Sequence, residues 1–262
     1  MKQLRGWWAV VRKELTIYFG TPIFYITGFF FLILAGYFFY TNIIYYNIIS
    51  FQAAQQASNP QIAAQLNPQQ MVFRPLFAVL GIILLFLVPF ITMRLLAEEK
   101  RSGTAELLFT YPLTDWAVIW GKFGAALLIY LILLAFTACY AAVLGLITPL
   151  DWGAVGTGYL GLFLLGAACL SLGLFATSLT ENQIVAGVVA FALLLLFWII
   201  GWVQELGAGG LGVVLKNLSL LDHYENFTKG VIDIRDLVYC LSFIYFFLFL
   251  TKRQLESRRW RA

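Results

Sequence analysis

Charged residues are scarce in this chain. Only 11% of the 262 residues are charged, whereas 61% are hydrophobic and 17% are aromatic. An ordinary soluble domain carries about a quarter charged residues, so the composition excludes that class and indicates a lipid bilayer as the solvent. The formal net charge of +4 is modest, and no nucleic-acid-binding face is indicated. We therefore expect an all-α membrane protein with no nucleic-acid partner.

Cysteine and histidine are also rare. Cys139, Cys169 and Cys240 fall inside apolar runs, which argues against a disulfide framework. His223 is the single histidine, and a metal site or an acid–base pair needs more than one histidine with scattered carboxylates. We expect no metal or catalytic residue here, and we favour a structural role or a partner contact for His223.

A phosphate-binding loop is missing as well. Such a loop reads Gly-x-x-x-x-Gly-Lys-Ser/Thr, because backbone amides and a lysine surround the phosphates. Gly121-Lys122 comes nearest, but Trp116 stands in place of the first glycine and Phe123 in place of the hydroxyl residue. The chain is thus expected to bind no cofactor and to be no enzyme; if ATP drives it, another chain holds the ATP and Mg²⁺.

Long apolar runs dominate what is present. A helix needs about 20 apolar residues to cross the hydrocarbon core. Six stretches qualify, and they are Ile23–Tyr46, Pro75–Met93, Val118–Ile147, Val155–Leu179, Ile184–Val203 and Leu237–Thr251. The chain is therefore expected to be one transmembrane domain over residues 1–262 with six spans.

Lysine and arginine predict the orientation of these spans. An even number of spans places both termini on one side, and that side then carries Lys2, Arg5, Arg12, Lys13, Arg94, Lys100, Arg101, Lys122, Lys252, Arg253, Arg258, Arg259 and Arg261. The other side carries only Arg74, Lys216, Lys229 and Arg235. Because positive residues stay in the cytoplasm, thirteen against four predicts cytoplasmic termini in a bacterial inner membrane.

Three segments outside the spans have their own patterns. Residues 1–21 place apolar side chains at helical spacing, which predicts a helix in the membrane interface ahead of Pro22, with a simple basic anchor as the alternative. The first outer loop, 47–72, has no charge before Arg74 and is either a surface helix or a loop. The glycine-interrupted apolar segment within 204–236 predicts short re-entrant outer helices.

The loop between spans two and three, 94–117, carries most of the functional argument. Gly103 interrupts a first short helix, Pro112 forces Tyr111 out of helical geometry, and Thr114 can cap the next helix. Charges beside an apolar knob suit docking into a groove on a soluble partner. A solvated connector on lipid headgroups is the open alternative.

This loop resembles that of a known family. The pattern Glu99-x-Arg101-x-Gly103-Thr104-x-Glu106-Leu107-Leu108, followed by Tyr111-Pro112-Leu113-Thr114 and Gly121-Lys122, is similar to the signature of ABC-transporter permeases of the second export class. The subgroup related to the gliding-motility-associated permease looks closest, because the segments Arg12-Lys13-Glu14-Leu15, Asp222 to Phe227 and Leu255 to Trp260 also agree with it. The resemblance spans essentially the whole chain.

The resemblance implies a role for the loop. In that family the segment is a coupling helix on a nucleotide-binding ATPase subunit, and two permease copies or homologues stand on two ATPases. The docking residues implied here are Glu98, Glu99, Arg101, Gly103, Thr104, Glu106, Leu107, Leu108 and Pro112. Outer-side contacts to substrate or to a periplasmic or membrane-anchored auxiliary protein would come from His223, Tyr224, Glu225 and Phe227.

Three functions remain in competition at this point. The first is the permease subunit of an ATP-driven exporter. The second is a mechanotransmission permease that acts on a periplasmic or lipoprotein partner and moves no solute. The third is an intramembrane enzyme that uses His223. The apolar spans leave the substrate undetermined.

Overall fold

The computed structural model describes residues 2–55, 67–103, 114–201 and 218–259, and within these ranges it contains helices and no strand. Six helical stretches are long and apolar enough to cross a membrane. They are α2 (Pro22–Gln55), the run Gln69–Arg101, α7 (Asp115–Ile147), α8 (Trp152–Leu179), α9 (Gln183–Ile200) and α12 (Ile234–Arg259). The predicted all-α fold with six spans is confirmed.

All the spans except α9 are longer than the apolar runs from which they are predicted. The first span, α2, continues nine residues past Tyr46 to Gln55, so the start of the first outer loop is helical. The second run contains a π-helical turn η1 (Gln69–Phe73), α4 (Arg74–Thr92) and α5 (Ala97–Arg101). A helix continues through polar residues as long as its backbone hydrogen bonds continue, so hydropathy alone does not show where it ends.

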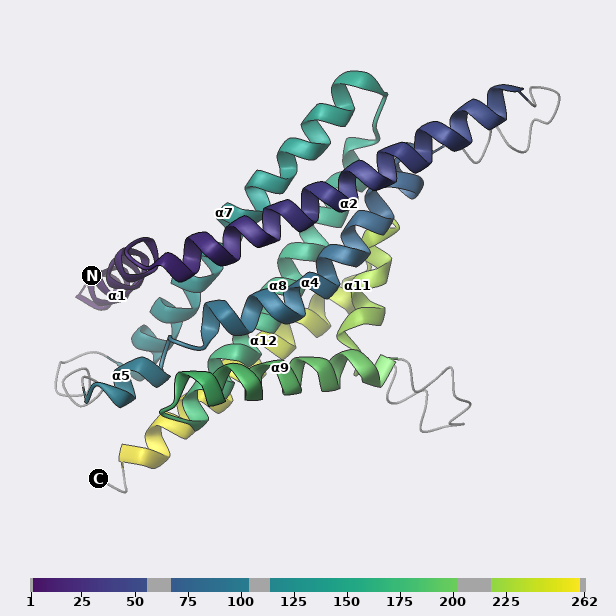
Figure 1. Cartoon of the computed structure of the whole chain (residues 1–262). Helices are drawn as coiled ribbons and strands as arrows, with labels where there is room; N and C mark the ends of the chain where they lie inside the picture. The colour runs from purple at the N-terminus through teal and green to yellow at the C-terminus, as the bar shows by residue number, and fades with distance from the viewer. Residues whose placement is uncertain (1, 56–66, 104–113, 202–217, 260–262) are drawn as a thin grey trace.

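Helix α8 lies at the centre of the bundle. It packs against α4, α7, α9, α11 and α12 (Figure 1), and 83% of its most apolar 18 residues are buried, compared with 22% in α2 and 17% in α9. Its glycines make this possible, since Gly158, Gly161 and Gly166 face the rings of Phe77, Phe227 and Tyr130. The core therefore forms around a helix whose small residues admit large neighbours.

Helix α1 (Lys2–Phe19) turns sharply into α2 at Gly20 and Thr21 (Figure 1). Val10 and Val11 are buried on the face that packs against α7, while Trp8 and Arg12 are exposed. The structure thus shows an amphipathic N-terminal helix, and its place in a membrane interface stays a prediction.

Short polar side chains mark several helix starts. The side-chain oxygens of Asp151, Asn182 and Ser219 accept backbone N–H groups at the first turns of α8, α9 and α11 (Leu220–Thr228). Thr114 occupies the N-cap position of α7 with extended backbone angles, but its side chain accepts no capping bond. The predicted cap at Thr114 is therefore correct in position and wrong in its hydrogen bond.

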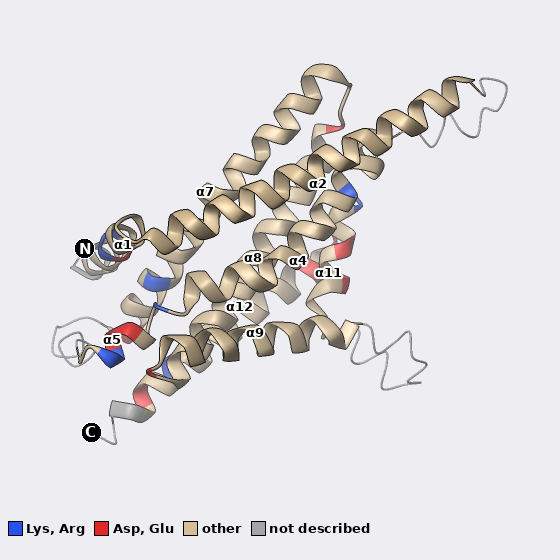
Figure 2. Cartoon of the chain, in the orientation of Figure 1, with Lys and Arg blue, Asp and Glu red and all other residues tan. Residues whose placement is uncertain are grey.

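Of the predicted re-entrant segment, residues 204–217 lie outside the described residues. The remainder holds α11, which packs on α8 and α4 at the end of the bundle opposite α5 (Figure 1). The start of α1, helix α5 and the end of α12 lie together at the other end, and charged residues gather at both ends of the bundle while its middle is free of them (Figure 2).

Candidate functional site

The helical run 69–101 is broken just before the predicted docking residues. Helix α4 ends at Thr92, and the N–H of Leu95 donates to the carbonyl oxygen of Thr92 at 2.9 Å, a tighter turn than the α-helical pattern. The hydroxyl of Tyr18 donates to the Ile91 carbonyl at 2.6 Å, and the ammonium of Lys122 donates to the Leu95 carbonyl at 2.6 Å. Backbone groups at this break are thus bound by side chains from α1 and α7.

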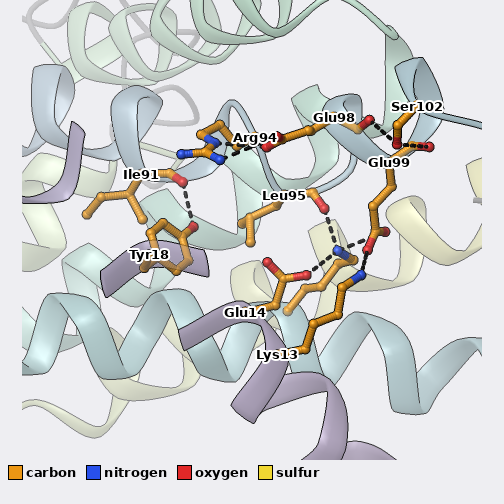
Figure 3. Close-up of polar contacts among 10 residues, drawn as sticks. Lys13, Glu14, Tyr18, Ile91, Arg94, Leu95, Glu98, Glu99 and Ser102 are labelled. Atoms are coloured by element: carbon orange, nitrogen blue, oxygen red, sulfur yellow. Dashed lines mark hydrogen bonds and ion pairs between the residues drawn. The ribbon is translucent and has the colours of Figure 1, made fainter. Parts of the chain in front are cut away.

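A buried ion cluster lies beside the break (Figure 3). Nζ of Lys122 is 2.6 Å from Oε1 of Glu14 and 2.9 Å from Oε2 of Glu99, and Nζ of Lys13 is 2.6 Å from the other oxygen of Glu99. The Lys122 side chain is 0% exposed and that of Glu14 is 7% exposed. Two lysines and two glutamates balance in charge, which is how a buried charged group is tolerated.

Glu99 raises the pKa of Lys13, which lies at the edge of this cluster. Burial acts to lower the pKa of Lys13, but the hydrogen bond and the negative charge of Glu99 outweigh it and raise that pKa above the ordinary lysine value. Lys13 is therefore an ammonium at neutral pH, and the pair with Glu99 is a charge-assisted hydrogen bond.

Helices α1 and α7 pack with their backbones close together next to this cluster. A Cβ added at Gly121 would come within 2.7 Å of Val10 Cγ1 and 3.4 Å of the Trp7 carbonyl oxygen. Gly124, one turn further, faces the ring of Trp7. Since no side chain separates the two helices at Gly121, α1 is seated tightly on α7.

Helix α5 ends at the predicted bend. Ser102 is its C-cap, and Gly103 follows with φ of 70°, a left-handed conformation that glycine adopts without strain. Lys100 reaches from α5 to the end of α8, where its Nζ donates to the carbonyl oxygens of Ser178 and Thr177. The helix is thus short and attached to its neighbours by charged side chains.

The predicted docking residues fall into three groups. Arg101 and Gly103 are exposed, and Glu98 is partly exposed and pairs with Arg94 in the same run at 2.9 Å. Glu99 points inward, with 12% of its side chain exposed. The other predicted docking residues lie outside the described residues, and they are Thr104, Glu106, Leu107, Leu108 and Pro112. Docking itself stays a prediction.

The predicted outer-side residues are divided by burial. Tyr224 is 2% exposed and donates its hydroxyl to the Phe77 carbonyl at 2.8 Å, and Phe227 is 1% exposed against Gly161. Burial raises the pKa of the Tyr224 hydroxyl well above the usual tyrosine value, so it stays a proton donor. These two side chains hold α11 in the core. Of the four predicted outer-side residues, only Glu225 and, in part, His223 are exposed enough to contact a partner.

Glu225 is half exposed and lies between two cations. Its Oε1 is 2.9 Å from Lys229 Nζ and 3.2 Å from Arg74 Nη2, at the start of α4. The hydrogen bond and charge of Lys229, together with Arg74, lower the pKa of Glu225 below the ordinary glutamate value. The carboxylate therefore keeps its charge at neutral pH and ties α11 to α4.

His223 has a structural explanation. Its Nδ1 lies 2.6 Å from Asp236 Oδ1, its ring stacks on Tyr239 with centroids 4.0 Å apart, and the second oxygen of Asp236 accepts the Asn226 amide at 2.9 Å. The group joins α11 to α12. In the part of the chain that the structure describes, no three His, Cys, Asp or Glu side chains are placed to hold a metal ion.

Sequence reasoning missed the partners of Lys122. The residue was placed at the cytoplasmic end of span three, and the available signal was that it is the single lysine in Asp115–Ile147. Its pairing with Glu14, 108 residues earlier, has no sequence signal. The run Arg12-Lys13-Glu14 contains two members of the cluster, Lys13 and Glu14, but it does not show which residues they pair with.

The fold defines a multi-pass α-helical membrane protein. After the break that follows α4, one short helix, α5, is joined to α1 and α7 by ion pairs. The family comparison is consistent with this class and goes further. The model of the ABC-2 family transporter protein matches residues 8–231, which is most of the chain and includes most of α1 and all of α5 and α11. The chain therefore belongs to the ABC-2 family and is a permease component of an ABC transporter, which implies association with an ABC nucleotide-binding subunit. No curated protein matches the chain.

Proposed function

We propose that this chain is the membrane subunit of an ATP-driven exporter, and that a separate nucleotide-binding subunit hydrolyses ATP and docks on the region 94–117. The observation that carries the proposal is the break after Thr92, which produces a separate short helix, α5, beside a buried ion cluster. A docked subunit could move such a helix without unfolding α4, because the break absorbs the change in backbone angles.

In this proposal the end of the bundle that holds α1, α5 and the end of α12 faces the cytoplasm. The membrane is the bacterial inner membrane, and two copies of the chain, or this chain and a homologous permease, stand on two ATPase subunits. The positive-residue bias supports this orientation, and so does the position of α1 and of the described end of α12 at the same end of the bundle as α5 (Figure 1). The gliding-motility-associated subgroup is the proposed nearest group, on the motifs named above.

The direct test is co-purification of an ATPase subunit with the chain. Arg101→Glu, on the exposed face of α5, should reduce the retained subunit, because it reverses a charge at the proposed contact. Lys229→Glu makes the same charge change at the opposite end of the bundle and should leave retention unchanged. Equal loss in both variants, or no ATPase bound to the unmodified chain, would contradict the proposal.

A mechanotransmission permease is the second candidate function, and the anchoring of α11 favours it. Because Tyr224 is bonded to α4 and Phe227 is seated on α8, a shift of these spans would move α11 and its exposed Glu225 with them. Such a helix could act on a periplasmic or lipoprotein partner. A photo-crosslinker attached at Glu225→Cys should capture a protein if this function is correct, and lipid or small molecules alone if it is not.

A further inference from the structure

The Lys122 cluster connects three parts of the chain that are far apart in sequence. Lys122 on α7 reaches Glu14 on α1, the Leu95 carbonyl in the break and Glu99 on α5. Stability alone does not call for such a cluster, since apolar side chains of similar volume commonly replace a buried ion pair without loss. What apolar side chains do not provide is a set of directional links between moving elements.

Two of the connected elements, α1 and α7, are packed tightly together. Val10 of α1 lies in the space where a side chain at Gly121 would be, and Tyr18 at the other end of α1 donates to the Ile91 carbonyl at the end of α4. Helix α1 thus has little freedom to slide on α7. A displacement that reaches either helix would move both.

The third element is short, and charged side chains attach it to its neighbours. Helix α5 has five residues, it is separated from α4 by the turn at Met93–Leu96, and Gly103 follows it. A cavity of about 220 Å³ opens between α1 and this region, lined by Tyr18, Arg94, Glu98 and the ion cluster. The cavity leaves room for α5, on the side that carries Glu98, to move toward α1.

We propose that Glu99 and Lys122, with Lys13 and Glu14, form the joint that passes a displacement of α5 to the α1–α7 body. This inference rests on the proposed function, because it needs an ATPase subunit that pushes on α5. The two oxygens of Glu99 are shared between Lys13 of α1 and Lys122 of α7, so one movement of α5 acts on both helices. Lys122 is a positioning residue: it also holds the Leu95 carbonyl and so fixes the angle of the break.

The decisive variant is Lys122→Met/Glu14→Leu in the full chain, purified with the ATPase subunit. It replaces the buried pair with apolar side chains, keeps the net charge and leaves the Lys13–Glu99 pair in place. We expect the variant to fold and to retain the ATPase subunit, and we expect the stimulation of ATP hydrolysis by the permease to fall by about fivefold or more. The measurements are the melting temperature, the amount of retained subunit and the ATPase rate with and without the permease.

Two further variants make the test independent of folding. Lys13→Met removes only the link from α1 to Glu99, and because the Lys13 side chain is 45% exposed it should fold whatever becomes of the buried pair. It should also lower the stimulation. Glu256→Gln is the matched control, since Glu256 pairs with Lys252 and Arg253 within α12 alone, and it should leave the stimulation unchanged.

The outcomes separate the inference from the proposed function. Stimulation within about twofold of the unmodified chain in both Lys122→Met/Glu14→Leu and Lys13→Met would overturn the joint while the permease function stands. An unmodified chain that retains no ATPase subunit would instead overturn the proposed function. Loss of subunit retention in the double variant would also refute the joint, because the cluster would then serve docking and not transmission.

Discussion

Replacing Gly166 in the central helix by alanine should destabilise the protein strongly for so small a change. The added Cβ would lie 2.2 Å from Tyr130 Cε1 and 2.4 Å from Tyr130 Cζ, far inside van der Waals contact. Tyr130 is fully buried and donates its hydroxyl to the Leu162 carbonyl at 2.7 Å, so the ring has no free space to enter. The ring must move, and the hydrogen bond is then strained or lost.

The magnitude follows from these two effects. Overpacking a well-packed core costs roughly 1–3 kcal/mol, and a buried hydroxyl that loses its acceptor, here that of Tyr130, adds about 1–3 kcal/mol. The higher helix propensity of alanine relative to glycine offsets up to about 1 kcal/mol of this loss of stability. We therefore expect Gly166→Ala to lower the stability by about 1–5 kcal/mol, measured by thermal or denaturant unfolding in detergent micelles.

The same helix provides the control. A Cβ at Gly156 meets no atom within 4 Å, so Gly156→Ala should leave the stability unchanged or raise it slightly. Tyr130→Leu should restore part of the stability lost in Gly166→Ala, because it removes the ring atoms that collide. If Gly166→Ala is as stable as Gly156→Ala, the packing of α7 against α8 inferred here is wrong.

Three other predictions follow from the anchoring of α11 and from the cysteines. Tyr224→Phe should lower the unfolding free energy by about 1 kcal/mol, since the hydrogen bond from the Tyr224 hydroxyl to the Phe77 carbonyl is lost; an unchanged unfolding curve would contradict that bond. The pKa of Glu225 is lowered by Lys229 and Arg74, so its stabilisation is fully present at neutral pH and disappears as the pH falls through that lowered pKa. Glu225→Gln should abolish this pH dependence of the melting temperature while costing about 1 kcal/mol or less at pH 7, as for other exposed pairs. Cys169, which is buried, should react with a small maleimide only after denaturation, and its labelling in the folded protein would refute the central position of α8.

Hydropathy and charge gave the spans of this protein because both act locally. A run of apolar residues must become a helix in lipid whatever its neighbours are, and the position of lysines and arginines predicts the sidedness independently of packing. The bend at Gly103 was also predictable, since a glycine after a short charged helix favours the left-handed conformation found there. The lengths of α2 and α12 were underestimated, because polar helix ends carry no hydropathy signal.

Tertiary structure alone decided which side chains meet. The sequence provides Glu14, Glu99 and Lys122 as separate charges, and only the packing of α1 and α5 beside α7 brings Glu14 and Glu99 each within 3 Å of the Lys122 ammonium. Tyr224 and Phe227 read as candidates for an outer surface, yet Phe227 packs into the space over Gly161 and Tyr224 donates to the Phe77 carbonyl, so both lie in the core. Membrane insertion is set by the sum of local transfer free energies, whereas these pairings depend on the shape of helices that are far apart in the chain.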